Sequence, residues 1–144
     1  MQYLEIKVGK QSYAIPVKDV VSIEEMKEIS NVPMPSKYIT GMVVIRDEVI
    51  QVYDLANRLG VTDLDKYADK KYGNMILVIE SFKKRYAMEI NLAKDIIELD
   101  GELNKVPDSV AHSDNVIMGI IKKDNDIVPV IDVHKLMIVR QEVA

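Results

Sequence analysis

The sequence predicts an all-β protein built as two small barrels, with a few short helices. Three observations support this fold class. Apolar residues recur in short runs that alternate with polar ones, polar turns separate successive runs, and one pattern of runs occurs twice along the chain. Short antiparallel strands avoid open edges by closing into barrels, and 144 residues fit one domain.

The first strand shows the alternation most clearly. Over residues 3–8 it places Leu4, Ile6 and Val8 on one face, and Glu5 and Lys7 on the opposite, polar face. Further strands are expected over 12–17, 20–23, 43–45, 49–53, 74–80, 86–90, 96–99, 116–121 and 127–131.

Two short helices are expected at the ends of strand pairs, over 55–59 and 133–137. Asp54 and Asp132 come directly before them and are interpreted as helix N-caps, each contributing about 1 kcal/mol.

The repeat relates Gly41 to Gly119 and Asp54 to Asp132, both at an offset of 78 residues. Each copy reads glycine, apolar strand, charged turn, apolar strand, aspartate, short helix. The two glycines are expected to allow a bend, a bulge or a close backbone approach. The copies predict approximate halves 1–62 and 74–144, each of about five strands, joined by a charged linker over 63–73.

Composition excludes several classes of protein. The net charge is −4, and the chain has one Phe and no Trp, which disfavours a small-barrel nucleic-acid module with a basic, aromatic face. No Cys is present, and no apolar stretch approaches the ~18 residues of a membrane helix. The N-terminus lacks the apolar core of a signal peptide, so we expect a cytoplasmic protein without direct membrane insertion.

Enzymatic signatures are also missing. Neither His112 nor His134 has a second ligand at a metal-binding spacing, and no glycine-rich phosphate loop or nucleophile elbow occurs. A small hydrolase using Asp54, Asp132 and His134 is disfavoured, because residues two apart on a short helix point to different faces. We therefore expect no enzymatic activity, no metal and no cofactor.

One run carries a resemblance to a known family. From residue 32 to residue 60 it reads Val-Pro-x-Pro-x-x-Tyr-x-x-Gly-x-x-x-x-Arg-x-x-Val-Ile-x-Val-x-Asp-Leu-x-x-Arg-Leu-Gly. This resembles the central signature of the CheW family, adaptors of bacterial chemotaxis, and the similarity extends over nearly the whole chain. The resemblance implies a single domain over 1–144, built of two five-stranded SH3-like barrels that are related by pseudo-symmetry and joined by a hydrophobic seam.

The resemblance also implies a function. The family has no enzymatic activity and no cofactor. It couples the histidine kinase CheA to chemoreceptors by binding the kinase regulatory domain through one barrel and the cytoplasmic receptor tip through the groove between barrels. The expected location is therefore the inner face of the membrane, reached through receptor arrays.

Four residues are the candidate partner contacts. The resemblance suggests Val20, Gly41 and Arg46, and Val20 together with Ile23 would form an apolar patch if exposed. Arg46 can reach a partner carboxylate or fold back onto a backbone carbonyl of its own domain.

Four positions depart from the family pattern: Ser22 replaces a carboxylate, Val44 an asparagine, Asp47 a turn glycine, and Gln51 a proline. The alternative function is therefore that of a CheW-like paralogue that serves another receptor system.

Overall fold

The structure is a computed structural model that describes residues 1–33, 37–61, 74–107 and 116–140. The predicted linker 63–73 and His112 lie outside the described residues. Along the described chain the strands are β1 (Gln2–Val8), β2 (Gln11–Pro16), β3 (Val20–Glu25), β4 (Ser30–Asn31), β5 (Ile39–Ile45), β6 (Glu48–Tyr53), β7 (Met75–Ser81), β8 (Lys84–Ile90), β9 (Leu92–Glu98), β10 (Ile117–Lys123) and β11 (Asp126–Ile131). The helices are the 3₁₀ turn η1 (Val17–Asp19), α1 (Leu55–Arg58) and α2 (Val133–Arg140).

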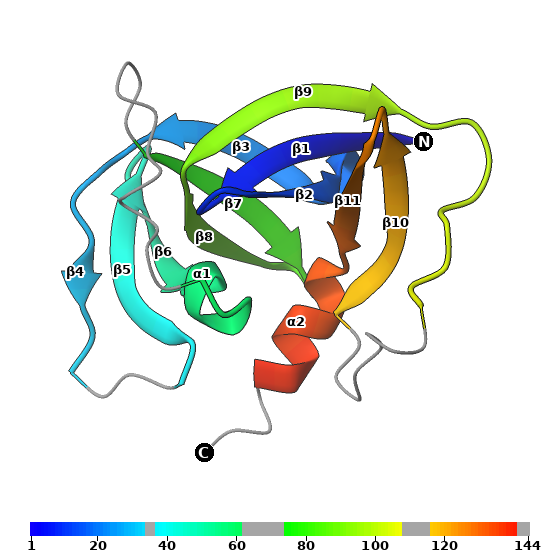
Figure 1. The fold of residues 1–144 in the computed structure, drawn as a ribbon. Coiled ribbons are helices and arrows are strands. Elements are labelled where there is room, and N and C mark those ends of the chain that lie inside the picture. The colour runs from blue at the N-terminus through cyan, green and yellow to red at the C-terminus, as the bar shows by residue number, and fades with distance from the viewer. Residues whose placement is uncertain (34–36, 62–73, 108–115, 141–144) are drawn as a thin grey trace.

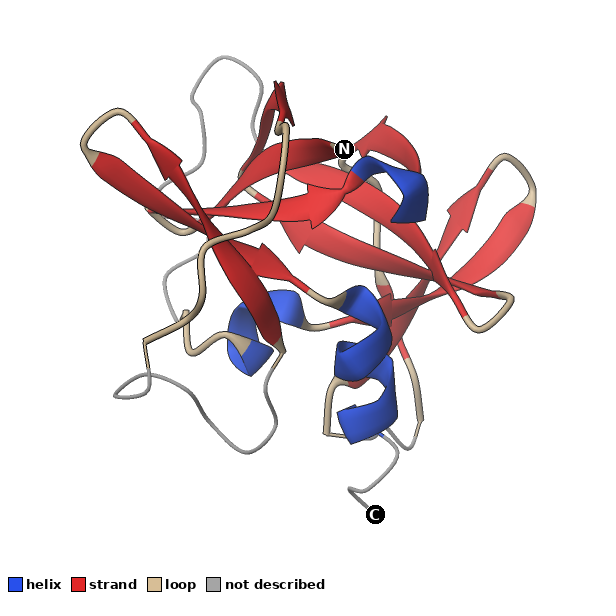
Figure 2. Cartoon of the chain, turned by 90° about the vertical axis from the view of Figure 1, so that its right-hand side faces the viewer, coloured by secondary structure: helices blue, strands red, loops and turns tan. Residues whose placement is uncertain are grey.

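These strands form two sheets, which confirms the all-β fold class (Figures 1 and 2). The terminal sheet has the order β10-β11-β2-β1-β9, and the central sheet the order β3-β7-β8-β6-β5-β4. Each sheet contains one parallel pair at the same place, β11 beside β2 and β6 beside β8. The order β10-β11-β2-β1-β9 of the terminal sheet therefore corresponds, strand for strand, to the order β5-β6-β8-β7-β3 of the central sheet. The two-residue β4 is an additional edge strand of the central sheet.

The sheets do not follow the two halves of the sequence. Strands β1 and β2 pair with β9, β10 and β11, so the terminal sheet joins the two ends of the chain. The intervening strands build the central sheet. The repeat indicates that two similar units exist, but sequence periodicity carries no information about which hairpin pairs with which unit.

The core has three parts. One buried cluster fills the central sheet, with Val43, Ile50 and Val78 among its members, and a second fills the terminal sheet around Tyr3 and Val130. The largest cluster lies between the sheets and includes residues of β1, β7, β8 and both α-helices. It provides the hydrophobic seam between barrels, and α1 and α2 lie at one end of the molecule (Figure 1).

Glu5 is the main departure from the predicted pattern. Alternation put it on a polar face, but the residue is only 2% exposed. The alternation itself is confirmed, because Leu4, Ile6 and Val8 share one face of β1. Glu5 is nevertheless covered, because its carboxylate pairs with Lys94 of β9 and Lys123 of β10. Tyr3 and Glu5 face the terminal barrel side, while Leu4, Ile6 and Val8 pack in the seam.

Candidate partner-binding surfaces

Both predicted capping residues accept backbone hydrogen bonds at a helix start. The Asp54 Oδ1 atom accepts from Asn57 N at 3.1 Å, in the first turn of α1. Asp132 Oδ1 accepts from His134 N at 3.1 Å and from Lys135 N at 3.2 Å, in the first turn of α2. These contacts are local in sequence and occur at equivalent places in the two sheets.

Gly41 and Gly119 lie where another segment crosses a strand at close range. A Cβ atom on Gly41 would lie 2.6 Å from Ser30 O in β4, and one on Gly119 would lie 2.5 Å from Leu103 Cβ. Both glycines are buried and lie at register shifts of their hairpins. A side chain at position 41 would therefore collide with the segment of β4, so the glycine determines the path of β5 and β4.

Arg46 lies at the tip of the β5–β6 hairpin. It and Asp47 are the two central residues of the turn, with φ of 51° and 67°, which is typical of a type I′ turn. The Arg46 Nη2 atom forms an ion pair with Glu24 Oε2 of β3 at 3.2 Å, while its side chain stays 77% exposed. The guanidinium thus contacts a carboxylate of its own domain and still presents most of its donors to solvent.

Val20 and Ile23 occupy opposite faces of β3. Val20 is half-buried and packs against the seam cluster, whereas Ile23 is exposed together with Val21. Glu24 follows Ile23 directly in β3, and its ion pair with Arg46 joins β3 to the tip of the β5–β6 hairpin.

Sequence reasoning missed the most exposed apolar residues of this region. Val44 in β5 and Val49 in β6 are directly paired across the hairpin and are 57% and 63% exposed, and Met42 is exposed beside them. A groove of about 530 Å³ runs along these residues and is also lined by Lys27 and Glu28. We call Met42, Val44 and Val49 the hairpin surface. Apolar alternation had marked these strands, but it cannot tell which apolar residues remain uncovered.

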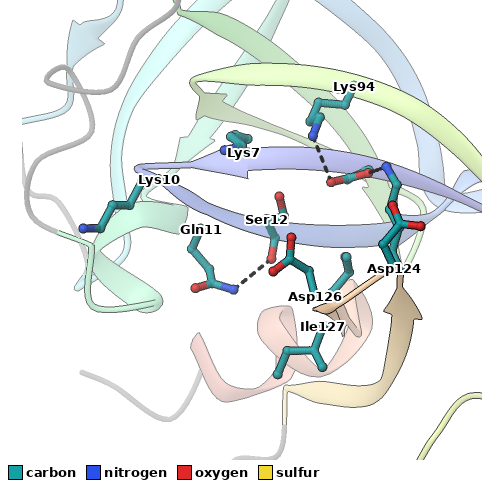
Figure 3. Close-up of a pocket in the computed structure, with 11 residues that line it drawn as sticks. Lys7, Lys10, Gln11, Ser12, Lys94, Asp124, Asp126 and Ile127 are labelled. Atoms are coloured by element: carbon teal, nitrogen blue, oxygen red, sulfur yellow. Dashed lines mark hydrogen bonds and ion pairs between the residues drawn. The ribbon is translucent and has the colours of Figure 1, made fainter.

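A second hollow, of about 400 Å³, lies on the terminal sheet and is strongly polar (Figure 3). At its floor, Glu5 pairs with Lys123 Nζ at 2.6 Å and with Lys94 Nζ at 3.3 Å. Burial alone would raise the pKa of Glu5, but hydrogen bonds from Lys123, Ser12 and Lys94 outweigh it and hold the pKa below the usual 4.5. The bond to Glu5 in turn raises the pKa of Lys123 above 10.5. A carboxylate held ionised by two ammonium groups is suited to fixing strands rather than to transferring protons.

His134 contacts other residues than the hydrolase hypothesis required. Its Nδ1 atom lies 2.8 Å from Ser81 Oγ, and its Nε2 atom lies 3.0 Å from Asp19 Oδ1. Ser81 is 1% exposed, which denies its hydroxyl access to a substrate. The histidine instead ties α2 to the end of β7 and to η1.

The described residues show neither a metal centre nor a membrane-spanning helix. In that part of the chain no three His, Cys, Asp or Glu side chains gather as metal ligands would. None of its helices has the length and apolar character needed to cross a bilayer.

Comparison with known proteins connects this geometry to a family. The CheW-like domain model matches residues 2–141. Chemotaxis protein CheW of Bacillus subtilis is 27% identical over 132 residues, which cover 90% of this chain and 82% of that protein. Chemotaxis protein CheW of Helicobacter pylori is 21% identical over 138 residues, covering 95% of this chain and 81% of that protein.

The fold is also shared with a solved structure. The crystal structure of the scaffolding protein TtCheW from Thermoanaerobacter tengcongensis matches with a TM-score of 0.80 at 20% identity, covering 94% of this chain and 86% of that one. The family model extends from the start of β1 through α2 and thus includes both sheets and the hairpin surface. The chain therefore belongs to the CheW-like domain family.

Proposed function

We propose that the protein is a non-enzymatic scaffold that couples the histidine kinase CheA to chemoreceptors, held at the inner face of the membrane through receptor arrays. The observation that carries this proposal is the hairpin surface of Met42, Val44 and Val49, an exposed aliphatic patch beside the charged Arg46. Protein interfaces commonly combine an apolar centre with a charged rim. Membership of a family whose matched relatives are named chemotaxis proteins supports the assignment.

The hairpin surface is assigned to the CheA regulatory domain. Its paired valines form an exposed aliphatic face along a groove of about 530 Å³, which suits a barrel that is itself CheW-like. Arg46 contributes exposed guanidinium donors at the edge of that face, and Glu24 holds the side chain in place. Of the other predicted contact residues, Ile23 is exposed on β3, whereas the half-buried Val20 and the buried Gly41 act through the packing of β3 and the path of β5.

The alternative, a paralogue for another receptor system, is favoured by one local feature. Asp47 stands beside Arg46 in the left-handed turn, where the family has glycine, and it adds a negative charge to the tip. Together with Ser22 and Gln51, it changes the charge and shape offered to a partner. Binding to the kinase and receptor of the same organism, compared with those of a distant one, separates the two functions.

The test is titration calorimetry of the full chain with a CheA regulatory domain and, separately, with a receptor signalling fragment. Both are expected to bind with dissociation constants below about 100 μM, which corresponds to roughly −5.5 kcal/mol. Absence of binding to both partners would exclude the coupling role.

The matched variants are Arg46→Glu and Lys105→Glu. Arg46→Glu is expected to weaken kinase binding about tenfold or more, because it replaces the rim cation by a like charge beside Glu24. Lys105→Glu reverses an exposed charge between β9 and β10 and serves as the control. If Arg46→Glu binds the kinase domain as well as Lys105→Glu does, and both variants keep the thermal stability of the unchanged protein, Arg46 is not part of the binding site.

A further inference from the structure

The described part of the chain has four hairpins with two-residue turns, and the first turn residue has a left-handed backbone in each. These residues are Gly9, Arg46, Phe82 and Asp124, with φ of 65°, 51°, 51° and 55°. Glycine and aspartate are common at such positions, whereas a bulky aromatic residue is a conformational outlier there. Arg46 already belongs to the proposed kinase surface. Phe82 has no role in that surface.

Pseudo-symmetry identifies what the fold itself requires at this turn. The β7–β8 hairpin corresponds to β1–β2, because each lies next to the parallel strand of its sheet. Gly9 fills the equivalent turn position without strain. The fold therefore does not require a phenylalanine at this turn, because a glycine occupies the equivalent position in the other copy.

Core packing does not explain Phe82 either. It is the single Phe of the chain, its side chain is 57% exposed, and its neighbour Lys83 is also left-handed, at φ 64°. Strained residues persist where a function uses them, and an exposed aromatic side chain is a frequent binding anchor.

The ring is held in place before any partner arrives. It lies edge-on to the His134 imidazole, with ring centroids 5.8 Å apart and an interplanar angle of 68°. The imidazole is itself fixed through both nitrogens, by Ser81 and by Asp19. An anchor that is pre-positioned loses little conformational entropy on binding.

The charges around the ring indicate the chemistry of the partner. Lys83 and Lys84 follow Phe82 and are exposed, and the exposed Lys18 and Lys135 are the sequence neighbours of Asp19 and His134. The nearby carboxylates are already engaged, Asp19 with His134 and Glu80 with Arg85. An apolar knob with a basic rim fits an apolar groove that is flanked by carboxylates.

We propose that Phe82 is a second binding anchor, which inserts between the helices of an acidic helical partner. Resting on the proposed function, we assign this partner to the receptor signalling tip. A single exposed ring suits the grooves between side-chain ridges of a helix pair, whereas the broader hairpin surface of Met42, Val44 and Val49 suits the kinase barrel. The two partners thus occupy different hairpins of the central sheet.

The test separates strain from binding through Phe82→Asn. Asparagine tolerates the left-handed backbone, so the midpoint temperature of thermal unfolding is expected to rise by about 2 °C or more. Affinity for the receptor fragment is expected to fall about tenfold or more, because the aromatic anchor is lost. Phe82→Tyr keeps the ring and serves as the matched control, with stability and affinity near those of the unchanged protein.

Charge is tested in a second variant, Lys83→Glu with Lys84→Glu. Receptor affinity is expected to fall, and the dependence of affinity on salt concentration to weaken. Kinase binding stays unchanged in all three variants. The inference is overturned if Phe82→Asn binds the receptor fragment within twofold of the unchanged protein, or if it loses kinase binding instead. The coupling role itself fails only when the unchanged protein binds neither partner.

Discussion

Glu5 places a charge inside the terminal sheet, where only paired charges are tolerated. Lys94 comes from β9 and Lys123 from the end of β10, so the carboxylate links β1 to two other strands. Removing one partner of a buried ion pair generally destabilises a protein by more than the intact pair stabilises it. We therefore interpret the Glu5 ion pairs in the polar hollow of Figure 3 as a structural clamp, which holds β1, β9 and β10 together.

This clamp predicts a specific dependence of stability on pH. The pKa of Glu5 is lower in the folded state, so its contribution is fully present above about pH 4.5 and is lost as the pH falls through the folded pKa. The pKa of Lys123 is raised, so its contribution is present below about pH 10.5 and is lost as the pH rises further. Glu5→Gln is expected to destabilise the protein by about 1.5–3 kcal/mol at pH 7.

Urea unfolding of both proteins at pH 7 and pH 3 measures the effect. The difference in unfolding free energy is expected to shrink at pH 3, because below about pH 4.5 the Glu5 carboxyl group of the unfolded chain takes up a proton that the lowered pKa of the folded state resists. A difference that stays constant from pH 7 to pH 3 would contradict the role of the Glu5 charge.

Single residues differ in how well they can be read from sequence. The contacts of Asp54 and Asp132 span two or three residues, and capping preferences are local, so both could be anticipated. The pairs Glu5–Lys123 and Arg46–Glu24 join distant strands. Their existence depends on strand order, which no local pattern contains.

Glycine contacts set the geometry of whole elements. β4 is only two residues long and pairs with β5 at Asn31–Gly41 and Ser30–Met42. It can approach because Gly41 lacks a side chain where Ser30 O and Ile29 Cγ2 lie. The same device on the other sheet places Leu103 and Asn104 against β10.

Gly41→Ala is therefore expected to displace β4 and to destabilise the protein by about 1–3 kcal/mol, since the added methyl group meets the backbone oxygen of Ser30 as well as Ile29 Cγ2. Hydrogen exchange measured by NMR is expected to show faster exchange of the Met42 and Asn31 amides.

Gly60→Ala is the control for this variant, because Gly60 has φ of 77° with nothing within 4 Å of an added Cβ atom. It strains the backbone without touching β4, so exchange at Asn31 stays slow. Equal exchange at Asn31 in both variants would refute the close-approach explanation.

Elements were more predictable than their exposure. Alternation located most of the strands, and the capping aspartates located the two α-helices. The two-residue β4 was not predicted, and the strand expected over 96–99 begins at Leu92 and bulges against β1. The gaps between predicted strands contain all four hairpin turns of the described chain, although the gap from 81 to 85 is wider than the observed turn of Phe82 and Lys83. Yet the exposed Val44 and Val49 look like core residues in sequence, since a partner-binding face and a buried face share one composition.

The whole molecule is held together across its two barrels. The largest apolar cluster combines residues of β1 and β2 with residues of β7 and β8, and His134 adds a polar link between α2, η1 and β7. Because each sheet takes strands from distant parts of the chain, neither half of the sequence contains a complete sheet core. Cooperative unfolding in a single transition follows from this shared seam.

Separate fragments 1–62 and 74–144 test this organisation most directly. The first lacks β9–β11 and β7–β8, and the second lacks β1 and β2, so each would leave an apolar strand edge without its partner. Each fragment alone is expected to show poor NMR dispersion and no cooperative thermal transition. An equimolar mixture is expected to regain both, because the pairings β1–β9 and β6–β8 can form between chains. A fragment 74–144 that melts cooperatively by itself would show instead that the second copy of the repeat is a folding unit, and that the exchange of strands is not what makes the two barrels one domain.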